Sequence, residues 1–247
     1  LRGSAVFDYK NEIWKIDGLR HLVTPRFSYR YVPNAERGRA FIPPIDRRTF
    51  MTYLPTLGLG DIRHVDDLGP MHTLRLGVDN TLQTRDAVYG SRDLLAFNLA
   101  ADLRLDDRPA GERRLSSIHA GLNLTPAPWL EFELYQSFST QQHTLQEFNT
   151  GLTLRDGDAW ALRFSSHYLR GQIEEYVVSP RLRLNEAYET VARFHYDARQ
   201  RRFNEQAFGL RQNLHNTWII EYLATFYDGP RRESSFGLSL RVEVLGF

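Results

Sequence analysis

The sequence predicts an all-β protein: an antiparallel up-and-down transmembrane β-barrel, or the C-terminal portion of a larger one, with about 13 strands here. Three observations predict this fold. Apolar and polar residues alternate with a period of two along many segments, these segments follow one another at short intervals, and no helical period persists anywhere. Alternation over roughly 9–11 residues suits a strand with one face toward lipid and one toward a wet lumen.

The stretch 235–246 shows the alternation most clearly. Its apolar residues fall on one side of an extended strand and its polar residues on the other. The apolar side is formed by Phe236, Leu238, Leu240, Val242 and Val244.

The same pattern recurs through most of the chain. Strands are expected at residues 5–14, 19–32, 72–84, 93–105, 116–124, 129–140, 146–155, 159–169, 175–184, 187–197, 204–214, 217–227 and 235–246. Asp-Gly, Asn and Pro residues between them are typical of turns, so consecutive strands form hairpins. A soluble β-sandwich is the alternative, but the hairpins continue with no break where a second sheet would begin.

The connections are of two kinds, and their alternation predicts an orientation. Those at 125–128, 156–158, 185–186 and 215–216 are short, as are the periplasmic turns of outer-membrane barrels. Longer ones, expected outside, are at 106–114, 141–145, 170–174, 198–203 and 228–233, and the C-terminus is then periplasmic. A much longer connection at about 33–71 is predicted to be an external, lid-like loop within one barrel domain that spans 1–247.

Tryptophan positions agree with this orientation without using loop length. All four tryptophans lie beside connections assigned to the periplasmic side, with Trp14 just before the expected connection 16–18. Indole rings settle at membrane–water interfaces because they are amphipathic. The sequence therefore predicts a periplasmic aromatic rim of Trp14, Trp129, Trp160 and Trp218.

Composition excludes several classes of protein. No apolar run among the 247 residues approaches the roughly 18 that a spanning helix needs. A net charge of +1 argues against a nucleic-acid partner, and the absence of cysteine excludes disulfides and thiol catalysis. Because an exported protein should carry a signal peptide and none is present at residue 1, the chain is expected to begin in mid-protein.

Catalytic chemistry is not predicted, and neither a cofactor nor a metal site is expected. Ser165 and His167 share one strand face, but no third residue or strained nucleophile turn accompanies them. Glu131 and Glu133 also alternate on one face, as the carboxylates of a polar barrel interior do. The eight histidines show no metal-ligand spacing.

Two stretches resemble a known family. Residues 17–33, DGLRHLVTPRFSYRYVP, are similar to the arginine-histidine-x-x-x-proline strand, followed by tyrosines, of the LptD family of lipopolysaccharide-assembly outer-membrane proteins (organic solvent tolerance proteins). Residues 74–85, LRLGVDNTLQTR, resemble the strand that follows the long external loop in that family. The family motif falls on His21, Pro25, Tyr29 and Tyr31.

The resemblance implies the C-terminal portion of a barrel in the outer membrane of a Gram-negative bacterium. A signal peptide and a periplasmic jelly-roll domain would lie upstream. The implied activity is passage of lipopolysaccharide to the outer leaflet, with lateral exit between the first and last strands. Implied partners are lipopolysaccharide, outer-membrane lipids, an LptE-like plug lipoprotein, periplasmic bridge proteins and the barrel-assembly machinery. The chain departs from the family in having no cysteines.

The position of Pro25 inside an expected strand can be interpreted in two ways. A proline inside a strand removes one ladder hydrogen bond, which produces a simple bend or, as the family resemblance suggests, loosens pairing where a barrel must open. The same two interpretations, a bend or loosened pairing, apply to Pro180 in a later strand.

Arginines gather in the connections expected outside, most densely at Arg199, Arg201 and Arg202, here called the arginine cluster. Guanidinium groups bind phosphate with paired hydrogen bonds, so this cluster is a candidate contact for lipid phosphates. The alternative is a solvated loop, because acidic residues such as Asp197 and Asp228 lie nearby. For the whole chain, the alternatives are a generic porin or solute channel and, less favoured, an outer-membrane enzyme.

Overall fold

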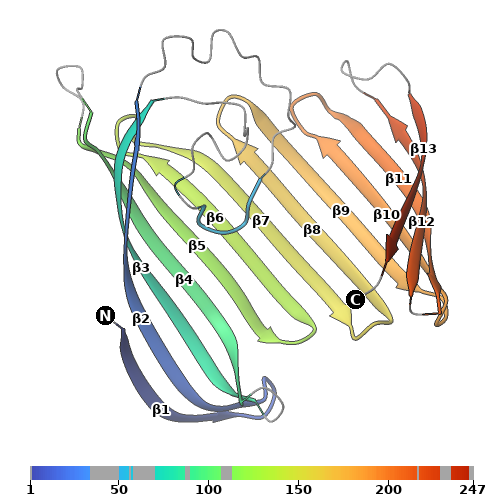
Figure 1. Cartoon of the computed structure of the whole chain (residues 1–247), viewed down its shortest axis with the longest axis horizontal. Helices are drawn as coiled ribbons and strands as arrows, with labels where there is room; N and C mark the ends of the chain where they lie inside the picture. The colour runs from blue at the N-terminus through green and yellow to red at the C-terminus, as the bar shows by residue number, and fades with distance from the viewer. Residues whose placement is uncertain are drawn as a thin grey trace. The chain divides into compact units, whose positions relative to one another are not determined.

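The computed structural model describes residues 2–33, 50–55, 57, 70–86, 90–106, 113–215, 217–228 and 235–244. All regular structure in these ranges is β-strand (Figure 1). The strands are β1 (Gly3–Asn11), β2 (Ile16–Val32), β3 (Met71–Asp86), β4 (Gly90–Arg104), β5 (Leu115–Ala127), β6 (Leu130–Ser139), β7 (Thr144–Asp156), β8 (Trp160–Leu169), β9 (Ile173–Arg183), β10 (Tyr188–Asp197), β11 (Arg202–Leu214), β12 (Trp218–Tyr227) and β13 (Phe236–Val244).

Each strand is hydrogen-bonded to its neighbour in sequence, and the described residues form one 13-stranded sheet in the order β1 to β13. The recorded registers, such as Pro25 opposite Val78 and Glu221 opposite Arg241, are antiparallel. Figure 1 shows the strands following one another in chain order. The predicted all-β, antiparallel up-and-down fold is confirmed, and each of the thirteen expected strands overlaps an observed one.

The chain divides into two compact units. Unit 1 comprises Leu1–Ala127 and Phe132–Thr150, and unit 2 comprises Pro128–Glu131 and Gly151–Phe247. Among the described residues of either unit, no helix is long and apolar enough to cross a membrane.

The two faces of unit 1 have the reverse of a soluble protein's polarity. Cross-strand neighbours Phe27 and Leu76 lie on one face, where their exposed fractions are 75% and 37%. The opposite face carries polar and ionisable residues that are nearly inaccessible, namely Arg75, Asp102 and His119 at 6%, 9% and 6%. We call these the apolar face and the polar face.

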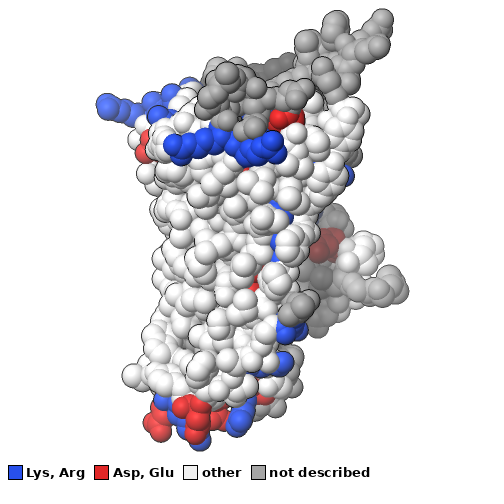
Figure 2. All heavy atoms as spheres, turned by 90° about the vertical axis from the view of Figure 1, so that its left-hand side faces the viewer, with Lys and Arg blue, Asp and Glu red and all other residues white. Residues whose placement is uncertain are grey.

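Unit 2 repeats this distribution. Leu162, Phe208 and Tyr222 are 37%, 45% and 44% exposed, whereas Ser165 and Thr225 on the other face are only 8% and 7% exposed. Figure 2 shows the left-hand side of Figure 1, where the first strands of unit 1 lie, and there a broad band almost free of charged residues separates charged side chains at its two ends. In each unit, large apolar side chains are thus mostly exposed, and many polar ones are covered.

Two predicted connections are wrong in position. β5 continues through Thr125-Pro126-Ala127, so the turn before β6 occupies only 128–129. Residues 16–18, expected as a connection, are already in β2, and the turn lies at 12–15. In both cases a strand extends through residues that usually mark turns.

The predicted difference in connection length holds only in part. The connections β2–β3, β4–β5 and β12–β13 are the long ones, but those at 140–143, 170–172 and 198–201 are as short as the turns at the other edge. Each of these three contains a residue with positive φ: His143 (52°), Gly171 (68°) and Arg201 (54°). A left-handed residue lets the chain reverse tightly, so fewer residues are needed. Of the predicted external loop 33–71, residues 34–49, 56 and 58–69 lie outside the described residues.

Candidate functional site

The candidate site is a polar network on the polar face of unit 1, centred on Asp102 of β4. Arg75 of β3 is its cross-strand partner and donates two hydrogen bonds, Nε to Oδ1 at 2.6 Å and Nη2 to Oδ2 at 2.7 Å. The side chains of Arg75 and Asp102 are 8% and 13% exposed. A paired, two-bond arrangement is what a buried carboxylate and guanidinium require.

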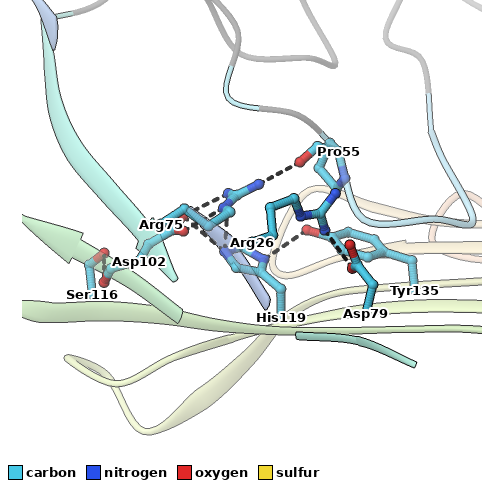
Figure 3. A network of polar contacts seen from close by, with 8 residues as sticks. All are labelled: Arg26, Pro55, Arg75, Asp79, Asp102, Ser116, His119 and Tyr135. Atoms are coloured by element: carbon cyan, nitrogen blue, oxygen red, sulfur yellow. Dashed lines mark hydrogen bonds and ion pairs between the residues drawn. The ribbon is translucent and has the colours of Figure 1, made fainter. Parts of the chain in front are cut away.

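His119 and Tyr135 extend the network across β5 and β6. His119 Nε2 lies 3.0 Å from Asp102 Oδ2, and its Nδ1 lies 3.0 Å from the hydroxyl of Tyr135. The two rings stack with centroids 6.2 Å apart. Ser116 donates a hydrogen bond to the Asp102 main-chain oxygen at 3.1 Å. Figure 3 shows His119 between Asp102 and Tyr135, so four strands meet in one set of polar contacts.

A part of the β2–β3 connection lies on this network. We call residues 50–55 and 57 the inner strap. Arg75 Nη1 donates a hydrogen bond to the carbonyl of Pro55, as Figure 3 shows. Arg30 of β2 donates to the carbonyl of Leu57 at 3.0 Å, and Asn149 of β7 donates to the carbonyl of Met51 at 3.0 Å.

The inner strap is also anchored by one apolar side chain. Leu54 is 6% exposed and forms a buried cluster with Ala100 and Tyr135. It lies over Gly121 of β5, where an added Cβ would be 3.8 Å from the Leu54 Cβ. The missing side chain at Gly121 therefore provides the space that the leucine fills.

A second ion pair, between Arg26 and Asp79, lies on the same face (Figure 3). The nitrogen-to-oxygen distance is 3.0 Å, and the side chains are 35% and 29% exposed. It is more accessible than the Arg75–Asp102 pair and contributes less to stability.

In unit 2 the polar face carries a row of opposite charges. The cross-strand registers place Arg183, Glu189, Arg211, Glu221 and Arg241 side by side on β9 to β13. Arg211 lies 3.8 Å from the Glu189 carboxylate. Unlike charges opposite one another stabilise neighbouring strands, so this row is compatible with a wet, charged surface.

Ser165 and His167, which were considered as a nucleophile and its base, both lie on β8. Ser165 is buried on the polar face of β8, and His167 has Glu175 as its cross-strand partner. Glu175 in turn lies 3.0 Å from His195 Nε2. Within the described ranges, no group of three or more His, Cys, Asp or Glu could hold a metal ion.

The family-motif residues lie together on the apolar face of β2. Tyr29 and Tyr31 are 60% and 59% exposed, and His72 of β3 contacts both. The Tyr29 hydroxyl is 3.1 Å from His72 Nε2. His21 pairs with Leu82 and Pro25 with Val78, in a ladder with no register shift between Arg20 and Val32. Pro25 therefore sits in a continuous strand pair.

The four tryptophans all lie at turns that join an odd-numbered strand to the next even one. Trp14 and Trp129 are in the β1–β2 and β5–β6 turns, and Trp160 and Trp218 are the first residues of β8 and β12. In an up-and-down sheet these turns share one edge. Which side of a membrane that edge faces stays a prediction.

The arginine cluster lies at the opposite edge of the sheet. Arg199 and Arg201 are exposed in the β10–β11 turn, and Arg202 begins β11, where it lies 3.8 Å from Asp228. In unit 1 a similar ion pair, Arg104 with Asp106 at 2.8 Å, lies at the end of β4, and the hydrogen bond from Arg104 lowers the pKa of the Asp106 carboxyl. Acidic partners thus accompany the arginines at this edge.

Comparison with known proteins gives no identification, since no family model and no curated protein matches the chain. The buried network also differs from the site residues expected from sequence. Arg75, Asp102 and Tyr135 were not singled out, and His119 was considered only as a metal ligand. The alternation does place all of them on the polar face, which was the available signal.

Proposed function

We propose that this chain is part of an outer-membrane β-barrel whose whole protein delivers lipopolysaccharide to the outer leaflet, as LptD-like proteins do. The reversed polarity of the two faces carries the membrane part of the proposal. Phe27, Leu76 and Leu162 are exposed while Arg75 and Asp102 are covered, an arrangement that is costly in water and favourable with lipid outside.

Aromatic residues at both edges of the sheet support the same proposal. The tryptophans lie at one edge, as described above. At the other edge the apolar face carries Tyr29 and Tyr31, and the aromatic contacts Tyr196–Phe203 and Phe226–Phe236 with centroids 5.2 Å and 5.3 Å apart. Transmembrane barrels have an apolar band between two such girdles.

The lipopolysaccharide part rests on the motif resemblance. The two resembling stretches, 17–33 and 74–85, are paired strands: Tyr29 lies opposite Leu74, and His21 opposite Leu82. The long β2–β3 connection joins them, in the order that the family has. The implied plug lipoprotein, bridge proteins and assembly machinery, and a periplasmic C-terminus, belong to the proposal.

Depletion of the whole protein in its native host tests the proposal. Newly made lipopolysaccharide should fail to reach the cell surface, and permeability to large hydrophobic antibiotics should rise. Re-expression of the intact protein should restore both. Normal surface lipopolysaccharide after full depletion would refute the proposal.

A solute channel is the second candidate, and the charge row of unit 2 favours it. A row containing Arg211 and Glu221 on the polar face would give a water-filled lumen a defined ion preference. Conductance of the purified protein in planar bilayers is the relevant measurement. Steady single channels whose ion selectivity shifts in Arg211→Gln, together with normal surface lipopolysaccharide on depletion, would favour the channel.

A further inference from the structure

The polar face of unit 2 contains a hollow of about 200 Å³ beside the β9–β10 turn. It lies at the edge of the sheet that carries the tryptophans, where β9 ends, β10 begins and β11 ends. Three arginines line it: Arg181 and Arg183 from β9, and Arg211 from β11. Alternate residues of a strand point to the same face, so both β9 arginines lie on the polar face with Arg211. We call this feature the arginine hollow.

Arg211 makes only loose contacts with its acidic neighbours. Its Nη1 lies 3.8 Å from a Glu189 carboxylate oxygen, and its Nη2 lies 3.6 Å from a Glu243 carboxylate oxygen. Both distances are longer than a hydrogen bond, and Arg211 Nε is buried with no hydrogen-bond partner among the described residues. Arg75 of unit 1, in contrast, donates two hydrogen bonds of 2.6 Å and 2.7 Å to Asp102. The terminal nitrogens of Arg211 are therefore available to another acceptor.

Arg181 and Arg183 use only part of their capacity to donate hydrogen bonds. Arg181 contacts Glu189 through Nε at 2.8 Å. Arg183 donates through Nε to the carbonyl of Asn185 at 3.2 Å, and its Nη1 lies 3.5 Å from Asp158. A guanidinium group carries five N–H donors, so both side chains have terminal N–H groups left for a ligand.

The acidic residues around the arginine hollow differ in how far they are exposed. Glu189 is the covered one, with a side chain 17% exposed. Asp158 and Glu243 are 84% and 56% exposed, and Glu186 is exposed in the β9–β10 turn. Water screens exposed charges, so their pairing with arginine is weak. The covered part of the hollow therefore has an excess of positive charge.

We propose that the arginine hollow binds a phosphate group, either free or as a monoester on a larger molecule. A carboxylate matches one planar guanidinium fork, whereas the oxygens of a tetrahedral phosphate accept hydrogen bonds from several guanidinium groups at different angles. A phosphate monoester also carries roughly two negative charges, which arginines from two strands can share. The site itself does not depend on the proposed function. Only the assignment of this phosphate to lipopolysaccharide rests on that function.

Chemical modification of arginine tests the site in the unaltered whole protein. The protein, folded in detergent micelles, is treated with phenylglyoxal at constant ionic strength, and modified arginines are mapped by peptide mass spectrometry. Inorganic phosphate should slow the modification of Arg181 and Arg211 several-fold. Arg193 is the matched control, because it lies on the same face of β10, 3.7 Å from Glu205, and does not line the hollow. Equal effects of phosphate on Arg193 and Arg211, or no effect on either, would overturn the proposal.

Variants test the affinity for phosphate, measured by phosphorus NMR. Binding should weaken by roughly tenfold or more in Arg211→Gln, which loses charge-assisted hydrogen bonds, and should hardly change in Arg193→Gln. Arg211→Lys keeps the charge but loses the fork, so it should also bind more weakly. Glu189→Gln removes the competing carboxylate and should bind several-fold tighter. Equal losses in Arg211→Gln and Arg193→Gln, or binding seen only in Glu189→Gln, would overturn the proposal.

Lipopolysaccharide and its dephosphorylated form distinguish the two sources of phosphate. If the ligand is a lipid-borne phosphate, intact lipopolysaccharide should protect Arg211 from phenylglyoxal at far lower concentration than inorganic phosphate, and the dephosphorylated form should not protect it. Protection by inorganic phosphate alone would assign the site to free phosphate. Protection by neither would overturn the site. None of these readouts measures delivery to the cell surface, so failure of the site and failure of the proposed function are separate results.

Discussion

Replacing Asp102 by alanine should destabilise the protein strongly. The carboxylate accepts two hydrogen bonds from Arg75 and contacts His119, and both partners have side chains only 8% exposed. Without the carboxylate, the Arg75 guanidinium stays buried, and it keeps its hydrogen bond to the Pro55 carbonyl of the inner strap. Removing one member of a buried ion pair costs about 3–5 kcal/mol, because the other charge is left uncompensated.

Equilibrium unfolding in urea of the protein folded in lipid vesicles, followed by fluorescence of its four tryptophans, measures this cost. The control is Asp158→Ala, whose pair with Arg183 has a 3.5 Å separation and side chains 84% and 40% exposed. An exposed pair contributes roughly 0–1 kcal/mol to stability. The urea midpoint of Asp158→Ala should therefore hardly differ from that of the unmodified protein.

A double-mutant cycle completes the experiment. Because Arg75→Met/Asp102→Leu removes both charges, its loss of stability should be well below the sum of the two single changes. The reasoning is refuted if Asp102→Ala unfolds at the same urea concentration as Asp158→Ala. Additive effects in the cycle would equally show that the two side chains do not depend on each other.

Three further predictions concern the two faces and one edge. Leu162→Arg should cost up to roughly 2–4 kcal/mol in vesicles, whereas Arg163→Gln on the polar face should cost far less; equal losses would mean that the face assignment is wrong. Gly209→Val should cost about 1–3 kcal/mol in the same unfolding assay, since an added Cβ would lie 2.6 Å from the Tyr222 carbonyl oxygen, and an unchanged midpoint would contradict this close approach. Changing all of the arginine cluster to Gln should lower surface lipopolysaccharide and raise antibiotic permeability at matched protein levels; wild-type values in both assays would leave the cluster a solvated loop.

The strands were predictable because one physical rule governs all of them. A strand with one apolar and one polar face must alternate strictly, and the segment Phe236–Val244 does so as clearly as any in the chain. Turn positions were less predictable. Thr125-Pro126-Ala127 has turn-forming composition but continues β5, because Pro is tolerated near a strand end.

The buried network could not be predicted, for a different reason. Alternation assigns Arg75, Asp102 and His119 to one face, but it does not give the register between strands. Arg75 meets Asp102 because β3 and β4 pair with a bulge near Gln83 that no local signal marks. The contact between Asn149 and the Met51 carbonyl is still harder to foresee, because it joins a strand to an irregular segment 98 residues away.

That long separation has a consequence for the order in which the molecule assembles. Every strand of the sheet pairs with its neighbour in sequence, so each hairpin can form over a short stretch of chain. The inner strap precedes β3 in the chain, yet its contact with Asn149 requires β7, and its contact with Tyr135 requires β6. Its seating must therefore wait until several later hairpins are in place, and until then the Arg75 guanidinium and the space above Gly121 remain open to water. Seating of the strap is a late folding event for a segment that is early in the sequence.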